Sequence, residues 1–284
     1  MLGPAEGRTR VPGDDRWFEA SLGKADMDIR LDGKTAIITG GSKGIGLAIA
    51  TRFAESGADV ALLARGQEAL SAAEKALGAR SRNRVLGVSC DVASADGINA
   101  AFQRVMGELG KIDIVVNNAG ISRAMPFEQV TDDIWREDIE LKLFAAIRLI
   151  RLAWPQMKDR RWGRVINVLN IGAKAPRAAS APTSVSRAAG MALTKALAGE
   201  GAPHNILVNA LLVGTIESDQ WVRRAEKLGV PLEKLLADFG KEIPLGRVGR
   251  AEEFANMACF LASDAASYIT GTATNIDGGR SPVV

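Results

Sequence analysis

The stretch TGGSKGIGLAIATRF, residues 39–53, decides the fold. It follows a short apolar run, and its second half places Ile45, Ala48, Ile49 and Phe53 at helical spacing. Glycines between the two allow a tight turn and a close approach to a ligand, and the start of a helix attracts anions such as a pyrophosphate. The stretch therefore predicts a strand, a nucleotide-binding turn and a helix. A tight turn without a ligand is the alternative for glycines taken alone.

Seven short apolar runs alternate with helical patterns along the chain: TAIIT, DVALL, RVLGVS, DIVVN, RVINVL, ILVNAL and TATNI. Such alternation produces right-handed βαβ units and a parallel sheet. We predict an α/β fold, a single-domain Rossmann-type doubly wound sheet of seven parallel strands with helices on both faces, over residues 31–284. Residues 1–30, rich in glycine, proline and charge, are expected to be a flexible extension or an over-long start, with Met27 as the original initiator.

The composition restricts the classes of partner. The net charge of +3 comes from 36 basic and 33 acidic residues in the absence of any long block of one sign, so we expect a small-molecule substrate and no nucleic acid. No apolar run reaches the about 18 residues that a membrane helix needs, and no secretory signal is visible, so we expect a cytoplasmic protein that does not bind membranes. Cys90 and Cys259 lie far apart without a histidine cluster, and no metal is predicted.

The cofactor prediction rests on two neighbouring segments. We expect the turn to hold the pyrophosphate through Gly40, Ser42, Lys43, Gly44, Ile45 and Gly46. The second apolar run ends at Ala64 and Arg65, where an NAD-binding chain usually has a carboxylate for the ribose hydroxyls. Two cations, Lys43 and Arg65, and no carboxylate favour a 2′-phosphate, and therefore NADP(H) over NAD(H). Solvated surface charges are the alternative explanation.

The motifs TGGSKGIG, CDVAS and NNAG, with the C-terminal run PLGRVGRAEEFANMACFLASDAASYITGTATNIDGG, resemble the short-chain dehydrogenase/reductase family. The resemblance covers about residues 31–280. It implies a nicotinamide cofactor, hydride exchange with an alcohol or carbonyl, and a homo-oligomer, tetramer or dimer. It further implies cofactor contacts from Asp91, Val92, Asn118, Ala119, Gly120, Arg187 and Gly214.

The resemblance also locates the catalytic positions, and there the chain departs from the family. That family uses an asparagine, a serine, a tyrosine and, four residues after it, a lysine. The matching residues in this chain are Lys142, Asn170, Thr183 and Arg187. The only tyrosine, Tyr268, lies far from this segment in sequence, so no other alignment restores the family pattern.

The replacements keep polar chemistry but remove the phenol. The threonine hydroxyl is a far weaker acid than a phenol, and the arginine stays charged and cannot relay a proton. The arginine can still bind ribose hydroxyls or a carboxylate. Thr183 and Asn170 can donate hydrogen bonds to a carbonyl oxygen. Lys142 is the titratable candidate, because burial beside Arg187 would lower its pKa. The structural alternatives are a solvated Lys142 on a helix face and a Thr183 that only starts a helix after Pro182.

The substrate side is predicted from the segment at about residues 215–245, which we expect to form a helical lid. Trp221 is expected as an aromatic wall, with core packing or a tetramer contact as equal alternatives. Lys174 and Arg177, together with the cations at positions 142 and 187, favour an anionic ligand.

The sequence thus predicts an NADP(H)-binding oxidoreductase that acts on a small carbonyl or hydroxyl compound through a non-standard active site. A catalytically silent NADP-binding regulator or partner subunit is the alternative from another class. A non-redox lyase or isomerase on the same fold is a minor one.

Overall fold

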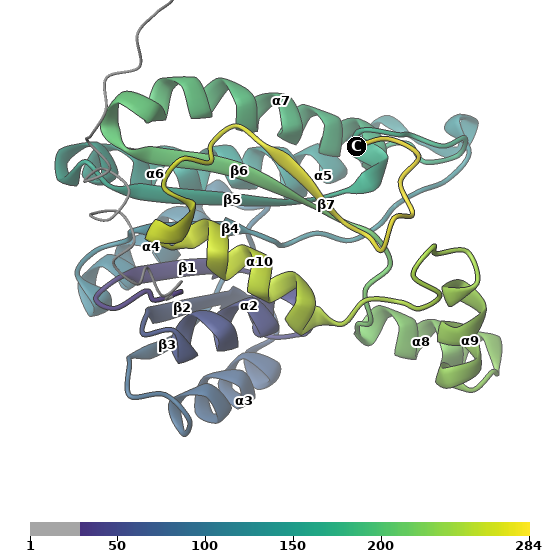
Figure 1. Cartoon of the computed structure of the whole chain (residues 1–284), viewed down its shortest axis with the longest axis horizontal. Helices are drawn as coiled ribbons and strands as arrows, with labels where there is room; N and C mark the ends of the chain where they lie inside the picture. The colour runs from purple at the N-terminus through teal and green to yellow at the C-terminus, as the bar shows by residue number, and fades with distance from the viewer. Residues whose placement is uncertain (1–28) are drawn as a thin grey trace, which may run out of the picture.

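The computed structural model describes residues 29–284 and has a parallel seven-stranded sheet at its centre (Figure 1). The strand order is β3-β2-β1-β4-β5-β6-β7. The first three strands are added toward one edge of the sheet and the last four toward the other, so the strand order reverses between β1 and β4. This confirms the predicted fold class. The strands are β1 (Thr35–Thr39), β2 (Asp59–Ala64), β3 (Val85–Ser89), β4 (Ile114–Asn117), β5 (Gly163–Asn170), β6 (Ile206–Val213) and β7 (Ala273–Ile276).

Helices cover both faces of the sheet because successive strand residues point to opposite sides. Ile38 of β1 packs into the core under α2 (Gly44–Glu55), α3 (Gln67–Gly78) and α10 (Ala251–Ala262). Its neighbour Ile37 packs into the opposite core, under α4 (Ala95–Leu109), α6 (Ala145–Arg160) and α7 (Thr183–Gly201). Strands that are buried on both faces are therefore apolar almost throughout, as the sequence runs indicated.

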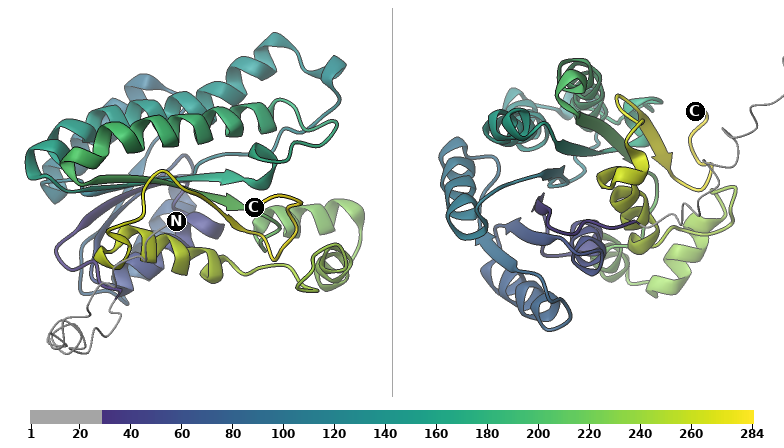
Figure 2. Two further views of the ribbon diagram at one scale, coloured as in Figure 1. Left: turned by 45° about the horizontal axis from the view of Figure 1, so that its top comes forward. Right: turned by 60° about the vertical axis from the view of Figure 1, so that its left-hand side comes forward.

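The remaining elements are short or stand outside the two layers. α5 (Asp132–Ile139) continues into α6 through a π-helical turn, η2 (Glu140–Phe144). α8 (Asp219–Leu228) and α9 (Leu232–Gly240) project beyond the ends of the strands (Figure 2). Short 3-10 turns are η1 (Phe127–Gln129), η3 (Ile171–Ala173), η4 (Ala202–His204) and η5 (Asp264–Ala266).

Helix α7 buries mostly small and polar residues. Its buried side includes Ser186, Gly190, Thr194 and Ala198, whereas Val185 is about half exposed. The reason is close packing: a β-carbon on Gly190 would lie 2.9 Å from the Leu169 side chain of β5. The helix therefore lies close to the sheet, which fixes the position of its first turn.

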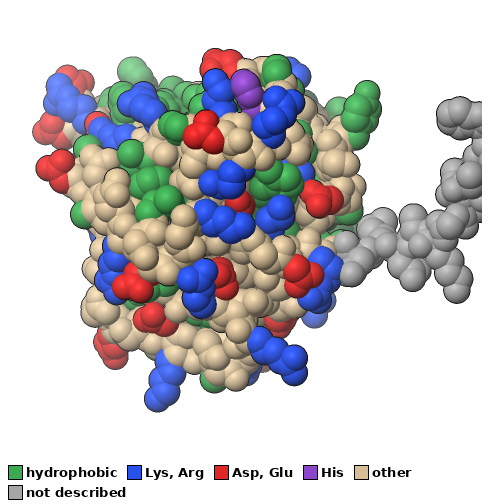
Figure 3. Space-filling view, turned by 90° about the vertical axis from the view of Figure 1, so that its left-hand side faces the viewer, with side chains coloured by type: hydrophobic (Ala, Val, Ile, Leu, Met, Phe, Trp, Pro, Cys, Tyr) green, Lys and Arg blue, Asp and Glu red, His purple; other side chains and the backbone are tan. Residues whose placement is uncertain are grey.

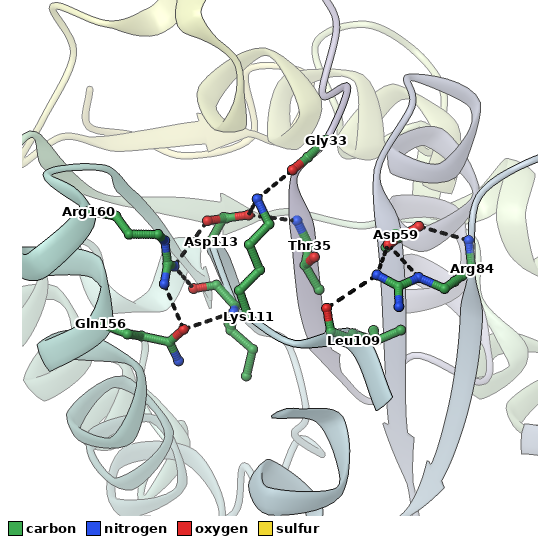
Figure 4. Close-up of polar contacts among 10 residues, drawn as sticks. Gly33, Thr35, Asp59, Arg84, Leu109, Lys111, Asp113, Gln156 and Arg160 are labelled. Atoms are coloured by element: carbon green, nitrogen blue, oxygen red, sulfur yellow. Dashed lines mark hydrogen bonds and ion pairs between the residues drawn. The ribbon is translucent and has the colours of Figure 1, made fainter. Parts of the chain in front are cut away.

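At the edge of the sheet away from α8 and α9 (Figure 1), a buried carboxylate holds the beginnings of the strands together (Figure 4). Asp113 is almost fully buried and accepts a hydrogen bond from the Thr35 amide at 3.0 Å. It also pairs with Lys111 and Arg160, each at 3.0 Å, so this one carboxylate, directly before β4, ties the start of β1 to the end of α6. On this side of the molecule charges of both signs are interspersed (Figure 3).

Several smaller expectations can be compared with the structure. Cys90 and Cys259 are buried free thiols. None of the helices within residues 29–284 is long and apolar enough to cross a bilayer. In the same part of the chain, His, Cys, Asp and Glu side chains do not gather into a metal-binding group. The expected flexible extension lies, except for its last two residues, outside the described residues.

Candidate active site

The strands β1, β4, β5 and β6 end around a cavity of about 560 Å³, within the size range of small-molecule sites. The cavity lies at the carboxyl edge of the sheet, where the chain reverses across it and where ligands bind in open α/β folds. Its described lining joins the glycine turn, the end of β4, the end of β5, the first turn of α7 and the lid segment: Gly40, Lys43, Gly44, Ile45, Gly46, Asn118, Ala119, Gly120, Ile121, Ser122, Val168, Leu169, Asn170, Thr183, Arg187, Val213, Gly214, Thr215, Ile216, Ser218, Trp221, Arg224 and Arg280.

The glycine turn has the geometry that the sequence predicted. Gly40 has a φ of +67°, and a β-carbon on Gly46 would lie 2.2 Å from the Gly40 carbonyl oxygen. Asn118 Nδ2 donates a hydrogen bond to the Thr39 carbonyl at 2.9 Å, which fastens the end of β4 to the turn. The N-cap residue Lys43 makes no side-chain capping hydrogen bond, so the first backbone amides of α2 can serve a ligand. Ser42 lies in the same turn but does not line the cavity.

Arg187 crosses from α7 to the end of β4. Its Nη1 donates to the Val168 carbonyl at 3.0 Å, and its Nη2 lies against residue 120, which has no side chain. Burial lowers the pKa of this guanidinium to about 10, although the nearby Asp138 carboxylate opposes the shift. The arginine remains charged at neutral pH.

Two buried polar atoms of the cavity lining lack a partner: Arg187 Nε, a donor, and Asn170 Oδ1, an acceptor. Buried polar groups are nearly always hydrogen-bonded, so unpaired ones in a cavity point to a polar ligand. A donor and an acceptor beside a glycine cradle fit a ribose and a pyrophosphate. The residues present therefore fit a dinucleotide.

Other predicted cofactor residues lie at the same edge of the sheet. Arg65 directly follows β2 and is exposed, and Asp91 and Val92 follow β3. None of these three lines the described cavity. Val92 is buried in the core, whereas the Asp91 carboxylate accepts the Ala93 amide at 3.1 Å. Gly214 follows β6 and lines the cavity, and a β-carbon there would lie 2.5 Å from Asp277.

Lys142 does not reach the cavity, because its side chain is fully enclosed in the turn η2. Its Nζ donates to Asp138 Oδ1, one helical turn earlier, and to Thr183 Oγ1 at 2.8 Å. The other Asp138 oxygen accepts a hydrogen bond from Ser186 Oγ at 2.6 Å. Thr183, which lines the cavity, is thus the link between this buried cluster and the site.

Burial lowers the pKa of Lys142 to about 8, with further lowering by Arg187 and Arg123. The Asp138 carboxylate opposes this shift, so the ammonium form of Lys142 remains populated near neutral pH. The expectation of a solvated lysine on a helix face does not hold for this side chain. A lysine that titrates near neutral pH is suited to proton transfer.

The sequence interpretation missed several residues of the site. Asp138 could have been found from its spacing, since residues four apart on a helix share one face. Arg280 had no local signal, because it comes from the segment after β7. Two cations proposed for the cleft are misplaced: neither Lys174 nor Arg177 lines it, and Lys174 donates to the Ala273 carbonyl instead.

The segment expected as a lid forms the helices α8 and α9. Trp221 lines the cavity, donates its indole N–H to the Ile216 carbonyl at 2.7 Å, and packs on Phe239 with ring centroids 4.6 Å apart. Arg224 lies over both rings, 5.5 Å and 5.2 Å from their centroids. The lid therefore presents an arginine, supported by aromatic rings, to the cavity.

Comparison with known proteins agrees with this geometry. The family model described as Enoyl-(Acyl carrier protein) reductase matches residues 40–281. The 3-oxoacyl-[acyl-carrier-protein] reductase FabG of Aquifex aeolicus (strain VF5) is 34% identical over 253 residues, which cover 89% of this chain and 99% of that protein.

Two solved structures are similar throughout. The L-sorbose reductase of Gluconobacter frateurii, complexed with NADPH and L-sorbose, is 37% identical with a TM-score of 0.88, covering 91% of this chain and 100% of that one. An NADPH-bound short chain oxidoreductase of Pseudomonas aeruginosa PAO1, described as containing an atypical catalytic center, is 37% identical with a TM-score of 0.84, covering 90% and 99%. From its sheet, its glycine turn and these similarities, the chain belongs to the short-chain dehydrogenase/reductase family of nicotinamide-dependent oxidoreductases.

Proposed function

We propose that this protein is an NADPH-dependent reductase of a small carbonyl compound that carries an anionic group. The observation that carries the proposal is the cavity itself. It joins the nucleotide turn to Asn170, Thr183 and Arg187, with a buried donor and a buried acceptor still unpaired.

NADP(H) is favoured over NAD(H) by charge. Lys43 immediately precedes α2 and Arg65 immediately follows β2, and both are exposed at the edge where the cofactor would lie. A 2′-phosphate is bound best by cations that are accessible to it. The two similar solved structures, each described with NADPH, support the same choice.

Among the described side chains that line the cavity, four are cations and none is a carboxylate. Lys43 and Arg187 are placed for the cofactor, which leaves Arg224 and Arg280 toward the lid. Arg280 already pairs with Glu242 at 2.8 Å, whereas the described contacts of Arg224 are with aromatic rings. Arg224 is therefore the cation placed to take a carboxylate or phosphate of the substrate.

When bound, the reduced nicotinamide supplies the hydride. The protein must hold the two reactants, polarise the carbonyl oxygen and provide a proton. Asn170, at the end of β5, and Thr183, at the start of α7, both line the cavity and can each donate a hydrogen bond to a substrate carbonyl oxygen. Arg187 lines the same cavity, together with these two residues and the glycine turn.

The first test is a fluorescence titration of the purified protein with NADPH and NADH, followed by NADPH oxidation with pyruvate, acetoacetate and the uncharged ketone diacetyl. Selective NADPH binding and turnover of an anionic ketone are expected. NADPH binding without turnover of any carbonyl tested would instead identify a silent binding protein. That candidate is favoured by one observation, since the chain's only tyrosine is fully exposed on the surface and supplies no phenol to the cavity.

A further inference from the structure

We propose that the Thr183 hydroxyl delivers the proton to the substrate oxygen, and that the buried Lys142 ammonium replaces that proton from behind. This inference rests on the proposed function and assigns the acid that the missing phenol leaves open. It differs from direct proton donation by Lys142, which the geometry excludes because the Lys142 side chain is fully enclosed and does not line the cavity.

The hydrogen bonds of Thr183 fix the direction of its own proton. A hydroxyl has one donor and two acceptor lone pairs. Thr183 Oγ1 accepts from Lys142 Nζ at 2.8 Å and from the Arg123 amide at 2.9 Å, so both lone pairs are used. No residue within the described part of the chain accepts a hydrogen bond from this hydroxyl. Its O–H is therefore left to point into the cavity that Thr183 lines.

The cluster behind Thr183 keeps the lysine charged and in place. Lys142 and Asp138 lie one turn apart across the junction of α5 and η2, and neither side chain is exposed. Asp138 accepts from Lys142 with one oxygen and from Ser186 with the other, at 2.6 Å. Neither Asp138 nor Ser186 lines the cavity, so both act through Lys142 and Thr183 as positioning residues.

The step balances as a proton transfer in sequence. Once the carbonyl carbon has received a hydride, its oxygen takes the Thr183 Oγ1 proton, and an Nζ–H bond of Lys142 breaks to restore the hydroxyl. Lys142 is left as a neutral amine beside the Asp138 carboxylate. After product leaves, water in the cavity returns the proton along the same two groups. An alkyl hydroxyl that only relays a proton needs no low pKa of its own.

The relay predicts a pH dependence. The charged groups that face Lys142 are Asp138, which raises its pKa, and Arg187 and Arg123, which lower it; burial is the largest cause, and the result is about 8. Arg123 is itself paired with Glu137. Below this pKa the ammonium can donate, so reduction should be maximal there and fall as the pH rises through about 8. Oxidation of the corresponding alcohol needs the amine and should rise over the same range.

The first readout is independent of turnover: an NMR titration of the protein containing ¹³Cε-lysine, with Lys142→Gln to assign the signal. In Thr183→Val the ammonium loses an acceptor, so the Lys142 pKa should fall further, whereas Thr183→Ser should leave it unchanged. An unchanged pKa in Thr183→Val would remove the Lys142–Thr183 connection and overturn the relay, whether or not a substrate is known.

The second readout is kcat against pH with the anionic ketone that the wild-type protein reduces. General acid catalysis contributes about 10²- to 10⁴-fold, so Thr183→Val and Lys142→Gln should each lose at least about 100-fold in kcat, with Thr183→Ser within about tenfold. NADPH affinity should stay within about threefold in all three. Thr194→Val is the matched control, because Thr194 is equally buried in α7 but bonds to Gly190 and Asn167 away from the cavity.

The outcomes separate the two proposals. If the wild-type protein does not bind NADPH, or binds it without reducing any ketone, the proposed function is refuted. The NMR titration still tests the hydrogen bond between Lys142 and Thr183. A Thr183→Val enzyme with wild-type kcat and an unchanged pH profile refutes the relay and leaves the reductase assignment intact.

Discussion

A β-carbon on residue 120 would lie 2.5 Å from Nη2 of Arg187, although the two positions are on different elements. Gly120 follows β4, and Arg187 is in the first turns of α7. The arginine therefore occupies the space that any side chain at position 120 would need. Since Arg187 also donates to the Val168 carbonyl of β5, this contact joins three elements at the floor of the cavity.

We predict that Gly120→Ala weakens NADPH binding by about tenfold, equivalent to 1.4 kcal/mol. The added methyl group displaces the guanidinium and breaks its hydrogen bond to Val168. Titration of tryptophan fluorescence with NADPH measures the loss. Gly199→Ala is the matched control, because a β-carbon there meets nothing within 4 Å; it should keep full affinity. Equal affinity in both variants would show that Arg187 does not contribute to cofactor binding.

The choice between NADPH and NADH is predicted to depend on Arg65. Removing a hydrogen bond to a charged group costs about 1.5–3 kcal/mol, so Arg65→Ala should raise the Kd for NADPH by about 10- to 100-fold. The Kd for NADH should not change, because NADH has no 2′-phosphate. Arg80→Ala, at an exposed arginine beyond the end of α3, serves as the control. A parallel loss for both cofactors would assign Arg65 a structural role instead.

The lid prediction concerns Arg224. Arg224→Leu should raise KM for an anionic ketone by about tenfold with kcat changed by less than about threefold, because charge recognition precedes the chemical step. The KM for diacetyl, which has no charge, should hardly change. Lys227→Ala in the same helix is the control for loss of one exposed cation. If both ketones lose affinity equally, Arg224 acts on lid packing through Trp221 and Phe239.

The opposite edge of the sheet provides a stability prediction. Asp113→Asn leaves Lys111 and Arg160 without their buried anion and should lower the free energy of unfolding by about 3 kcal/mol. This loss is at the lower end of the range for breaking a buried ion pair, because the Lys111 and Arg160 side chains are partly exposed to solvent. Urea denaturation measures it, and Asp238→Asn, on the surface of α9, should leave the midpoint unchanged. NADPH affinity of the folded variant should equal that of the wild type, since the site lies at the other end of the strands.

The sequence by itself determined the architecture and the nucleotide turn. A strand that is buried on both faces needs a local run of apolar residues, and a tight turn needs glycines such as Gly40 and Gly46. Both requirements are local in sequence, so the pattern predicts the strand and the turn directly. Helical spacing placed Thr183 and Arg187 one turn apart, and the resemblance to the family implied that Asn170 lies near them.

Only the tertiary structure decided what these residues can do. Whether Lys142 is solvated or enclosed depends on how closely α7 packs against β5 and η2, and small residues such as Gly190 allow that close packing. The same packing brings Thr183 to Lys142 across 41 positions of the chain. Burial, and with it the pKa and the direction of a hydrogen bond, is a property of the assembled elements, because the solvent that each group loses is displaced by residues distant in sequence.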